Sequence, residues 1–242
     1  MEIRICENPD ALGKSAAKSV AEELRKIINE KGYARIALST GASQFDTLKY
    51  LVLEDVDWSK VEMFHLDEYV DLPETHPASF RKYLKERFVA KVGKLKAVNF
   101  VDGTKEGVAA LTEKITCEPI DIGLIGIGEN AHIAFNDPPA DFDTQESYII
   151  VNLDEACRRQ QLGEGWFPTI DDVPRQAVSM TVSQIMKCKQ IVSCVPYAVK
   201  SNAVMKTLTT KETTNLVPAT KLKEHSDFTL YLDMDSAKEV LI

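Results

Sequence analysis

Two short stretches of the sequence carry side chains that can take up and release protons. One contains the acids Asp67 and Glu68, and the other contains His132 with Asn130 before it and Asp137 after it. An imidazole can donate or accept a proton near neutral pH, and a carboxylate can act as a general base. If the fold brings the two stretches together, these residue types indicate a site for proton transfer.

A third stretch suits an anion, because its small residues let backbone N–H groups approach an oxyanion just before an expected helix. Its members are Thr40, Gly41, Ala42 and Ser43. Three cations could assist them, namely Arg158, Arg159 and Lys200. Lys200 is expected in the first turn of a helix, where a cation is unfavourable unless an anion lies nearby. Each feature alone is also compatible with a capped turn or a solvated surface, but together they suit a phosphate.

An anion site beside an acid and a histidine suits aldose–ketose chemistry on a sugar phosphate. That chemistry needs a base that moves a proton between adjacent carbons and a second group that opens the sugar ring. We assign Asp67 to the first task and His132 to the second, with Asp137 orienting the imidazole. The sequence has no GxSxG elbow, no HExxH or HxxxH metal motif and no GxGxxG fingerprint after its first strand. We therefore expect no metal and no cofactor.

The three stretches follow runs of residues that are typical of buried strands. Residues 34–38, 61–65 and 120–127 are such runs, and each is followed at once by one of the stretches. Open α/β sheets bind ligands outside the carboxyl ends of their strands, so this placement is the expected one.

Strands and helices alternate along the whole chain. Further strands are expected at residues 1–6, 98–101, 147–153, 190–195 and 228–232, and helices at residues 8–31, 45–53, 76–88, 107–115 and 198–208. The pattern predicts a single α/β domain over residues 1–242, with one doubly wound, Rossmann-like, mostly parallel sheet flanked by helices.

The amino-acid composition limits the classes of partner and the compartment that we expect. A net charge of -8 argues against nucleic acid or an anionic membrane as a partner, although a local pocket can still be positive. The five cysteines are scattered without a CxxC pair, which is typical of free thiols in a reducing compartment. The first residues do not form a signal peptide, and no apolar run approaches the roughly 20 residues of a membrane span. We expect a cytoplasmic protein that acts on a small molecule.

At several motifs the sequence resembles the glucosamine-6-phosphate deaminases, also called isomerases. The motifs are LDEY at 66–69 with HPASF at 76–80, GIGENAHIAFNDP at 126–138, LSTGAS at 38–43, IDDVP at 170–174 with residues 177–181, and Lys200 in its helix. The similarity extends from near the N-terminus to at least Leu208. The wider superfamily includes 6-phosphogluconolactonases and sugar-phosphate-sensing regulator domains, but the LDEY and HIAFN segments favour the deaminases.

The resemblance implies a reversible, metal-free reaction in which a 2-amino-2-deoxyhexose 6-phosphate is isomerised and deaminated to a ketose 6-phosphate and ammonia. It also implies a role for each site residue. Asp67 would move the proton between C1 and C2, and His132 would open the ring with Asn130 and Asp137 as companions. Residues 40–43, Lys200 and either Arg159 or Arg158 would hold the phosphate, with Glu68 and Ala131 nearby.

Three features depart from the family pattern. Asp137 stands where glutamate is usual, and the missing methylene moves the carboxylate by about 1.5 Å, which either breaks its contact with His132 or is absorbed by a shift of the loop. Asn130 stands where some members have aspartate, so His132 would be a weaker base than beside two acids. The stretch 158–167 is longer and more polar than expected, which leaves galactosamine 6-phosphate as an alternative to glucosamine 6-phosphate.

Other functions also remain open. A 6-phosphogluconolactonase-type lactone hydrolase would not need Asp67 as a carbon base, and a non-catalytic sugar-phosphate sensor would ordinarily carry a DNA-binding helix-turn-helix and a basic patch. An isomerase that releases no ammonia is a further alternative. Because no extension follows Ile242, we expect a monomer or a small homo-oligomer rather than a hexameric allosteric enzyme.

Overall fold

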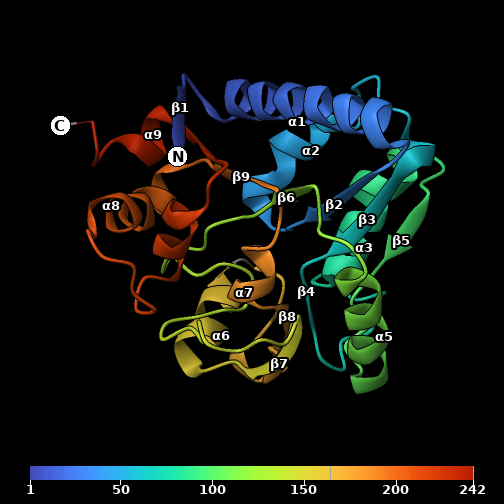
Figure 1. Cartoon of the computed structure of the whole chain (residues 1–242). Helices are drawn as coiled ribbons and strands as arrows, with labels where there is room; N and C mark the ends of the chain where they lie inside the picture. Colours follow the sequence, from blue (N-terminus) through green and yellow to red (C-terminus); the bar gives the residue numbers. More distant parts are fainter. Residues whose placement is uncertain (164, 242) are drawn as a thin grey trace.

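The computed structural model describes residues 1–163 and 165–241 of the chain. Within these residues a seven-stranded parallel sheet runs through the middle of the molecule (Figure 1). Its strands, in spatial order, are β1 (Glu2–Cys6), β10 (Phe228–Asp233), β9 (Gln190–Val195), β6 (Ile122–Leu124), β2 (Ala34–Leu38), β3 (Val61–His65) and β5 (Ala97–Asn99). The predicted doubly wound α/β fold is confirmed.

Helices cover both faces of this sheet. One face carries α1 (Pro9–Lys31), α2 (Phe45–Leu51), and α3 (Phe80–Leu84), which continues through a π-helical turn (Lys85–Val89) into α4 (Ala90–Val92). The other carries α5 (Lys105–Thr116), α7 (Val182–Ile185), α8 (Ser201–Thr209) and α9 (Met234–Ala237). Strand β2 shows why both faces are apolar: Ala34, Ile36 and Leu38 pack into the core with α1, whereas Ala37 packs into the opposite core.

The ends of the longest helix follow from its sequence. The Asn8 side chain accepts a hydrogen bond from the Ala11 backbone N–H at 2.9 Å, and Pro9 occupies the first turn, where its missing N–H costs nothing. Gly32 ends α1 with φ = 87°, in the left-handed region that favours glycine. The expected helix at residues 8–31 is therefore confirmed almost to the residue.

A second, smaller sheet was not expected. Strands β4 (Asp67–Tyr69), β8 (Gln176–Met180) and β7 (Tyr148–Asn152) form an antiparallel sheet beside the carboxyl ends of the large one. Helix α6 (Glu155–Gly163) lies against it and was also not predicted. The LDEY segment thus leaves β3 and immediately becomes the edge strand of another sheet, which fixes the direction of its side chains.

The strand expected at 120–127 is shorter than predicted, since β6 covers only Ile122–Leu124. Backbone pairing continues on both sides of it. The Asp121 N–H donates to the Arg35 carbonyl at 2.9 Å, and the Ile125 N–H donates to the Val192 carbonyl at 3.0 Å.

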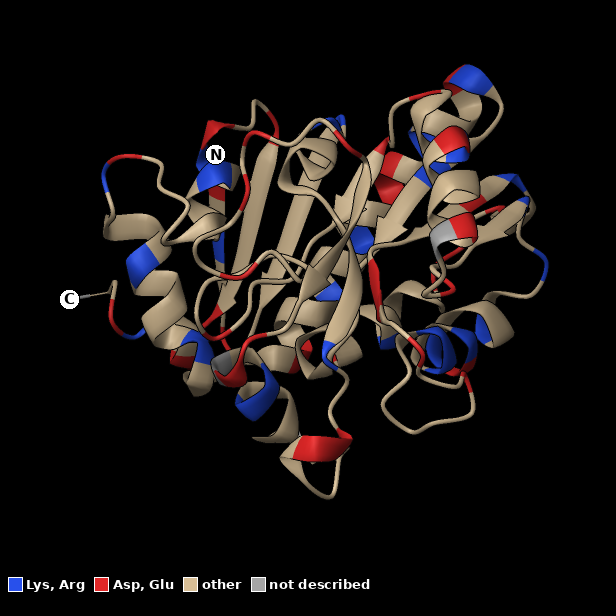
Figure 2. Cartoon of the chain, turned by 90° about the horizontal axis from the view of Figure 1, so that it is seen from below, with Lys and Arg blue, Asp and Glu red and all other residues tan. Residues whose placement is uncertain are grey.

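Charged side chains lie mainly on the helices and loops around the central sheet, whose strands are largely free of them (Figure 2). This distribution agrees with the nearly continuous apolar runs of a sheet that is buried on both faces. No helix in the described part of the chain is both long enough and apolar enough to cross a membrane.

Candidate active site

The candidate site lies where the connections of the large sheet change direction. From β2 the chain moves outward to β3, whereas from β6 it moves to β9 on the other side, so β2 and β6 flank the switch point. Ligands of open α/β sheets bind outside the strand ends at such points. The three chemically equipped stretches follow β2, β3 and β6, and the segment with Lys200 follows β9.

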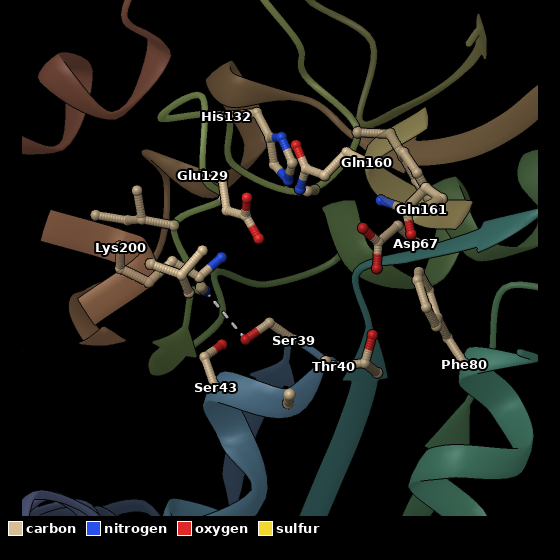
Figure 3. Close-up of a pocket in the computed structure, with 18 of the residues that line it drawn as sticks. Ser39, Thr40, Ser43, Asp67, Phe80, Glu129, His132, Gln160, Gln161 and Lys200 are labelled. Carbon is tan, nitrogen blue, oxygen red and sulfur yellow. Dashed lines mark hydrogen bonds between the residues drawn. The ribbon is translucent and has the colours of Figure 1, made fainter. Parts of the chain in front are cut away.

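A cavity opens at this position (Figure 3). Its lining includes most of the residues expected from the sequence, namely Thr40, Gly41, Ala42, Ser43, Asp67, His132 and Lys200. In Figure 3 the carboxylate of Asp67 and the imidazole of His132 both point into it from separate segments of the chain, while Thr40, Ser43 and Lys200 lie along another side. Side chains distant in sequence are therefore brought together as predicted.

The loop after β2 is held in place from three directions. The Ser39 hydroxyl accepts a hydrogen bond from the Gly126 N–H at 3.1 Å, which ties the loop to the chain after β6. The buried Gln44 amide donates to the Cys194 carbonyl at 3.1 Å, and the Tyr83 hydroxyl donates to the Gly41 carbonyl at 3.0 Å. Gly41 itself has φ = 94°, so a side chain there would strain the turn. The loop at residues 40–43 is therefore firmly held.

Asp67 begins β4 and pairs with Ser179 of β8. Its side chain is almost fully buried, although it lines the cavity. Burial and, to a smaller degree, the charge of neighbouring Glu68 raise the pKa of Asp67 to about 8. A carboxylate with a pKa near the working pH is a much stronger base than an exposed one.

Glu68 points away from this cavity, because successive side chains of a strand face opposite sides. It is fully buried and accepts hydrogen bonds from the Ser79 hydroxyl at 2.8 Å and from the Arg81 backbone N–H at 2.9 Å. The Arg81 guanidinium forms an ion pair with it at 3.3 Å. Glu68 therefore anchors the start of α3, and its place next to Asp67 is structural.

His132 and Asp137 form a pair on the loop after β6. Nδ1 of His132 lies 3.1 Å from Oδ1 of Asp137, at ion-pair distance, although among the described residues this nitrogen has no well-directed hydrogen bond. The Asn130 amide donates to the same carboxylate oxygen at 2.8 Å, and the Asn130 carbonyl oxygen accepts from the His132 N–H at 3.1 Å. Asn130 thus joins both members of the pair.

The charge of Asp137 is stabilised by these neighbours. Burial alone would raise the pKa of Asp137, but the neighbouring His132 imidazole and the amide of Asn130 outweigh burial and lower the pKa to about 2. The carboxylate is therefore ionised throughout the physiological pH range, where it can orient the imidazole.

The backbone of this loop is strained where it turns. Ala131 and Ala134 have φ values of 66° and 50°, in the left-handed region that residues with a side chain rarely occupy. Tyr197, which also lines the cavity, has φ = 80°. Such strain clusters at functional sites, because the surrounding structure must hold it.

Neither Arg158 nor Arg159 lies among the residues that line the cavity. Arg158 is directed to backbone carbonyls, with its Nε donating to Val173 at 3.2 Å and its guanidinium also donating to Ile170. Arg159 is exposed and pairs with Glu155, one turn earlier in α6. The helical phase of α6 thus turns both side chains away from the cavity, and the assignment of one of them to the phosphate stays a prediction.

The same helix instead directs Gln160 and Gln161 into the cavity, which the sequence analysis missed. Glu129 and Phe80 also line it without having been predicted as site residues. A signal for the helix was present, since the Asp154 carboxylate caps α6 by accepting from the Cys157 N–H at 2.8 Å. An aspartate at this position is a common N-cap residue, so Asp154 indicates the start of α6.

These features define a class of protein, an α/β enzyme with an acid–base site at the switch point of its sheet and a small-residue loop suited to an anion. Among residues 1–163 and 165–241, no group of three or more His, Cys, Asp and Glu side chains is arranged to hold a metal ion.

Comparisons with known proteins identify the family. A sequence model for glucosamine-6-phosphate isomerases and 6-phosphogluconolactonases matches residues 7–231, so the chain belongs to this family. The glucosamine-6-phosphate deaminase of Staphylococcus epidermidis is 36% identical over 233 residues, which cover 92% of this chain and 94% of the relative.

Solved structures agree with this assignment. A monomeric glucosamine-6-phosphate deaminase superposes with a TM-score of 0.87 at 27% identity, covering 98% of this chain and 99% of its own. A 6-phosphogluconolactonase from Shewanella baltica shares the fold, with a TM-score of 0.76 at 18% identity and coverage of 96% and 97%.

Proposed function

We propose that this protein converts a 2-amino-2-deoxyhexose 6-phosphate and water into the ketose 6-phosphate and ammonia, and that glucosamine 6-phosphate is its substrate. The observation that carries this proposal is the convergence of Asp67 and the His132–Asp137 pair on one cavity beside the 40–43 loop. Two proton-transfer groups of different character are what ring opening and carbon deprotonation require. The name of the staphylococcal relative supports glucosamine over galactosamine.

Ring opening is assigned to His132. The imidazole takes the proton of the anomeric hydroxyl and delivers a proton to the ring oxygen, so the C1–O5 bond breaks and C1 becomes an aldehyde. Asp137, ionised and 3.1 Å from Nδ1, stabilises the imidazolium that forms between the two transfers.

Proton transfer between carbons is assigned to Asp67. Its carboxylate takes the proton from C2, the C1=C2 bond forms, and the C1 oxygen gains the electron pair and takes the proton that the 2-ammonium group of the sugar gives up. Return of the proton from Asp67 to C1 gives an iminium at C2. Water adds to this carbon and ammonia leaves, which yields the ketose 6-phosphate.

The phosphate is assigned to the opposite end of the cavity. Residues 40–43 supply backbone N–H groups and the hydroxyls of Thr40 and Ser43, and Lys200 supplies a cation. Because Arg158 and Arg159 are directed elsewhere, the proposed site uses one lysine and no arginine.

An ammonia assay tests the proposal. Purified protein is incubated with glucosamine 6-phosphate, galactosamine 6-phosphate and a 6-phosphogluconolactone, each with and without a chelator, and ammonia and free acid are measured. We expect ammonia from glucosamine 6-phosphate in both conditions. Lactone hydrolysis without ammonia from either amino sugar would overturn the proposal in favour of a lactonase, and absence of any turnover with retained binding would favour a sensor.

We further propose that the protein acts in the cytoplasm as a monomer or small homo-oligomer. The description of its 27% identical structural relative as monomeric supports the smaller state. Light scattering coupled to size-exclusion chromatography tests this, with 27.0 kDa as the expected monomer mass.

A further inference from the structure

We propose that Gln161 is a catalytic residue that donates a hydrogen bond to the C1 oxygen of the open-chain sugar, and that Tyr69 positions it. This inference rests on the proposed function and extends it, because Gln161 lines the cavity but has no role in the proton transfers assigned to Asp67 and His132. Its basis is one hydrogen bond between two buried side chains and the direction that this bond imposes on an amide.

The Tyr69 hydroxyl donates a hydrogen bond to Oε1 of Gln161 at 2.6 Å. Tyr69 is 1% exposed and Gln161 6% exposed, so the bond is shielded from water. The two ends of a glutamine amide differ in role, since the oxygen only accepts and the nitrogen only donates. With its oxygen engaged by a hydroxyl, Gln161 is left with its NH₂ group as the end available to the cavity.

Tyr69 is itself held rigidly. Its ring packs against Phe80, Phe135 and Phe167 at centroid distances of 5.1, 5.3 and 5.6 Å. Phe80 and Phe135 also line the cavity. The aromatic cluster therefore fixes the hydroxyl, and the hydroxyl fixes the amide, so the donor needs little reorganisation during the reaction.

The position of this donor suits the carbon chemistry. Asp67 and Tyr69 are two residues apart on β4 and so share one face of the strand. Gln161 and Asp67 both line the cavity, and their side chains are drawn there in Figure 3. A donor on the same cavity as the base that removes the C2 proton can reach the C1 oxygen, which is two bonds away from C2.

Charge develops on that oxygen in the step that Asp67 catalyses. When the C2 proton leaves, the electrons of the C–H bond form C1=C2 and the carbonyl electrons move onto the C1 oxygen. An N–H aimed at the oxygen is worth more in this state than in the neutral aldehyde, so it raises kcat rather than merely lowering KM. Removal of one such donor in other enzymes costs about 10²–10³ in kcat.

Three variants test the inference in the intact protein. Gln161→Met keeps the size of the side chain but removes the donor, and we expect kcat and the rate of C2 proton exchange in D₂O to fall by about 10²-fold with KM changed less than about threefold. Tyr69→Phe frees the amide to turn, so we expect a smaller loss of kcat. In the double variant Tyr69→Phe/Gln161→Met both hydrogen-bonding groups are removed, so no buried polar group is left without its partner. The double variant therefore separates an effect on catalysis from an effect on folding.

The double variant should unfold at a temperature close to that of the wild type and still show the full loss of kcat. Arg159→Ala is the matched control, because it lies on the same helix but outside the cavity, and it should retain wild-type kinetics. Unchanged kcat in Gln161→Met, or a rise in KM alone, would overturn the inference while wild-type ammonia release still upholds the proposed function. No ammonia from the wild type would overturn the function and this inference with it.

Discussion

Nδ1 of His132 lies 3.1 Å from Oδ1 of Asp137, so the aspartate carboxylate reaches the imidazole at a position where the resemblance implied a longer glutamate. The loop that carries the pair turns tightly. The His132 carbonyl accepts from the Gly128 N–H at 2.9 Å, and the Ile133 carbonyl accepts from the Asn136 N–H at 3.1 Å. The contact that the sequence analysis considered at risk is therefore present.

Replacing Asp137 by asparagine, a side chain of nearly the same size and shape, should impair the reaction. The substitution removes the negative charge beside the imidazolium formed during ring opening, and we expect kcat to fall by about 10²-fold or more. The loss should be larger on the closed-ring sugar than on a substrate analogue that cannot cyclise. Steady-state kinetics on the two compounds measure this, and equal losses would argue against ring opening as the task of the pair.

Asp137→Asn should also lower the thermal stability of the folded protein, and the size of this effect should depend on pH. Because the folded-state pKa of Asp137 is lowered from 3.8 to about 2, its ionisation stabilises the folded state above about pH 4, and this contribution is lost as the pH falls toward 2. Thermal unfolding should therefore show Asp137→Asn less stable than the wild type at pH 7, with a difference that shrinks below pH 4. Asp143→Asn, an exposed acid further along the same connection, should show no such difference.

Asp67 should show the opposite stability behaviour. Its folded-state pKa is raised from 3.8 to about 8, so the folded protein holds a proton that the unfolded chain releases, and stability falls as the pH rises from about 4 to 8. Asp67→Asn removes this effect, and its melting temperature should increasingly exceed that of the wild type across this range. C2 proton exchange should meanwhile drop by about 10³-fold. Wild-type exchange in the variant would remove Asp67 from its role.

The pKa of Asp67 also predicts the pH dependence of the wild type. Only the ionised carboxylate accepts a proton, so kcat/KM should rise close to tenfold per pH unit below about pH 8 and level off above it. A pH profile with saturating and limiting substrate measures this. A plateau that already begins near pH 5 would mean that the carboxylate is not protonated in the free enzyme.

The sequence predicted the parts of the site that follow strands of the large sheet. The runs before Thr40, Asp67 and Asn130 are largely apolar, each with one charged residue near its start, which is typical of buried parallel strands and therefore locates their carboxyl ends. Once these ends are located, the topology of the fold brings the loops together, and the predicted cluster of Asp67, His132 and residues 40–43 is confirmed as a cavity lining.

The sequence did not predict the part of the site that belongs to α6. Residues 155–163 include two arginines and two glutamines in succession, and charge alone favoured the arginines as phosphate ligands. Which of four successive side chains faces a cavity depends on the phase of the helix, at 100° per residue, and that phase is set by packing against residues far away in the sequence. Tyr69, 92 positions before Gln161, is one of them.

The proposed phosphate site, with Lys200 and without an arginine, can be tested by substitution. Lys200 lines the cavity, whereas Arg159 pairs with Glu155 on the surface. Lys200→Met should therefore raise KM for the sugar phosphate by about 10-fold or more and weaken inhibition by inorganic phosphate, as expected when a charge-assisted contact is lost. Arg159→Met should leave both quantities within about twofold. If the arginine variant has the higher KM, the assignment is reversed.

Gly128 provides a test of how closely His132 must be placed. A Cβ added at Gly128 would lie 2.2 Å from Nε2 and Cε1 of His132, far inside contact distance, so Gly128→Ala must push the ring aside. Since a displacement of about 1 Å of a catalytic group can cost about 10²-fold in rate, we expect such a loss of kcat with nearly unchanged binding of inorganic phosphate at the 40–43 loop. Gly163→Ala is the matched control, because nothing lies within 4 Å of the added carbon. Comparable activity of both variants would show that the imidazole can move without harm, and would contradict a direct role of His132 in ring opening.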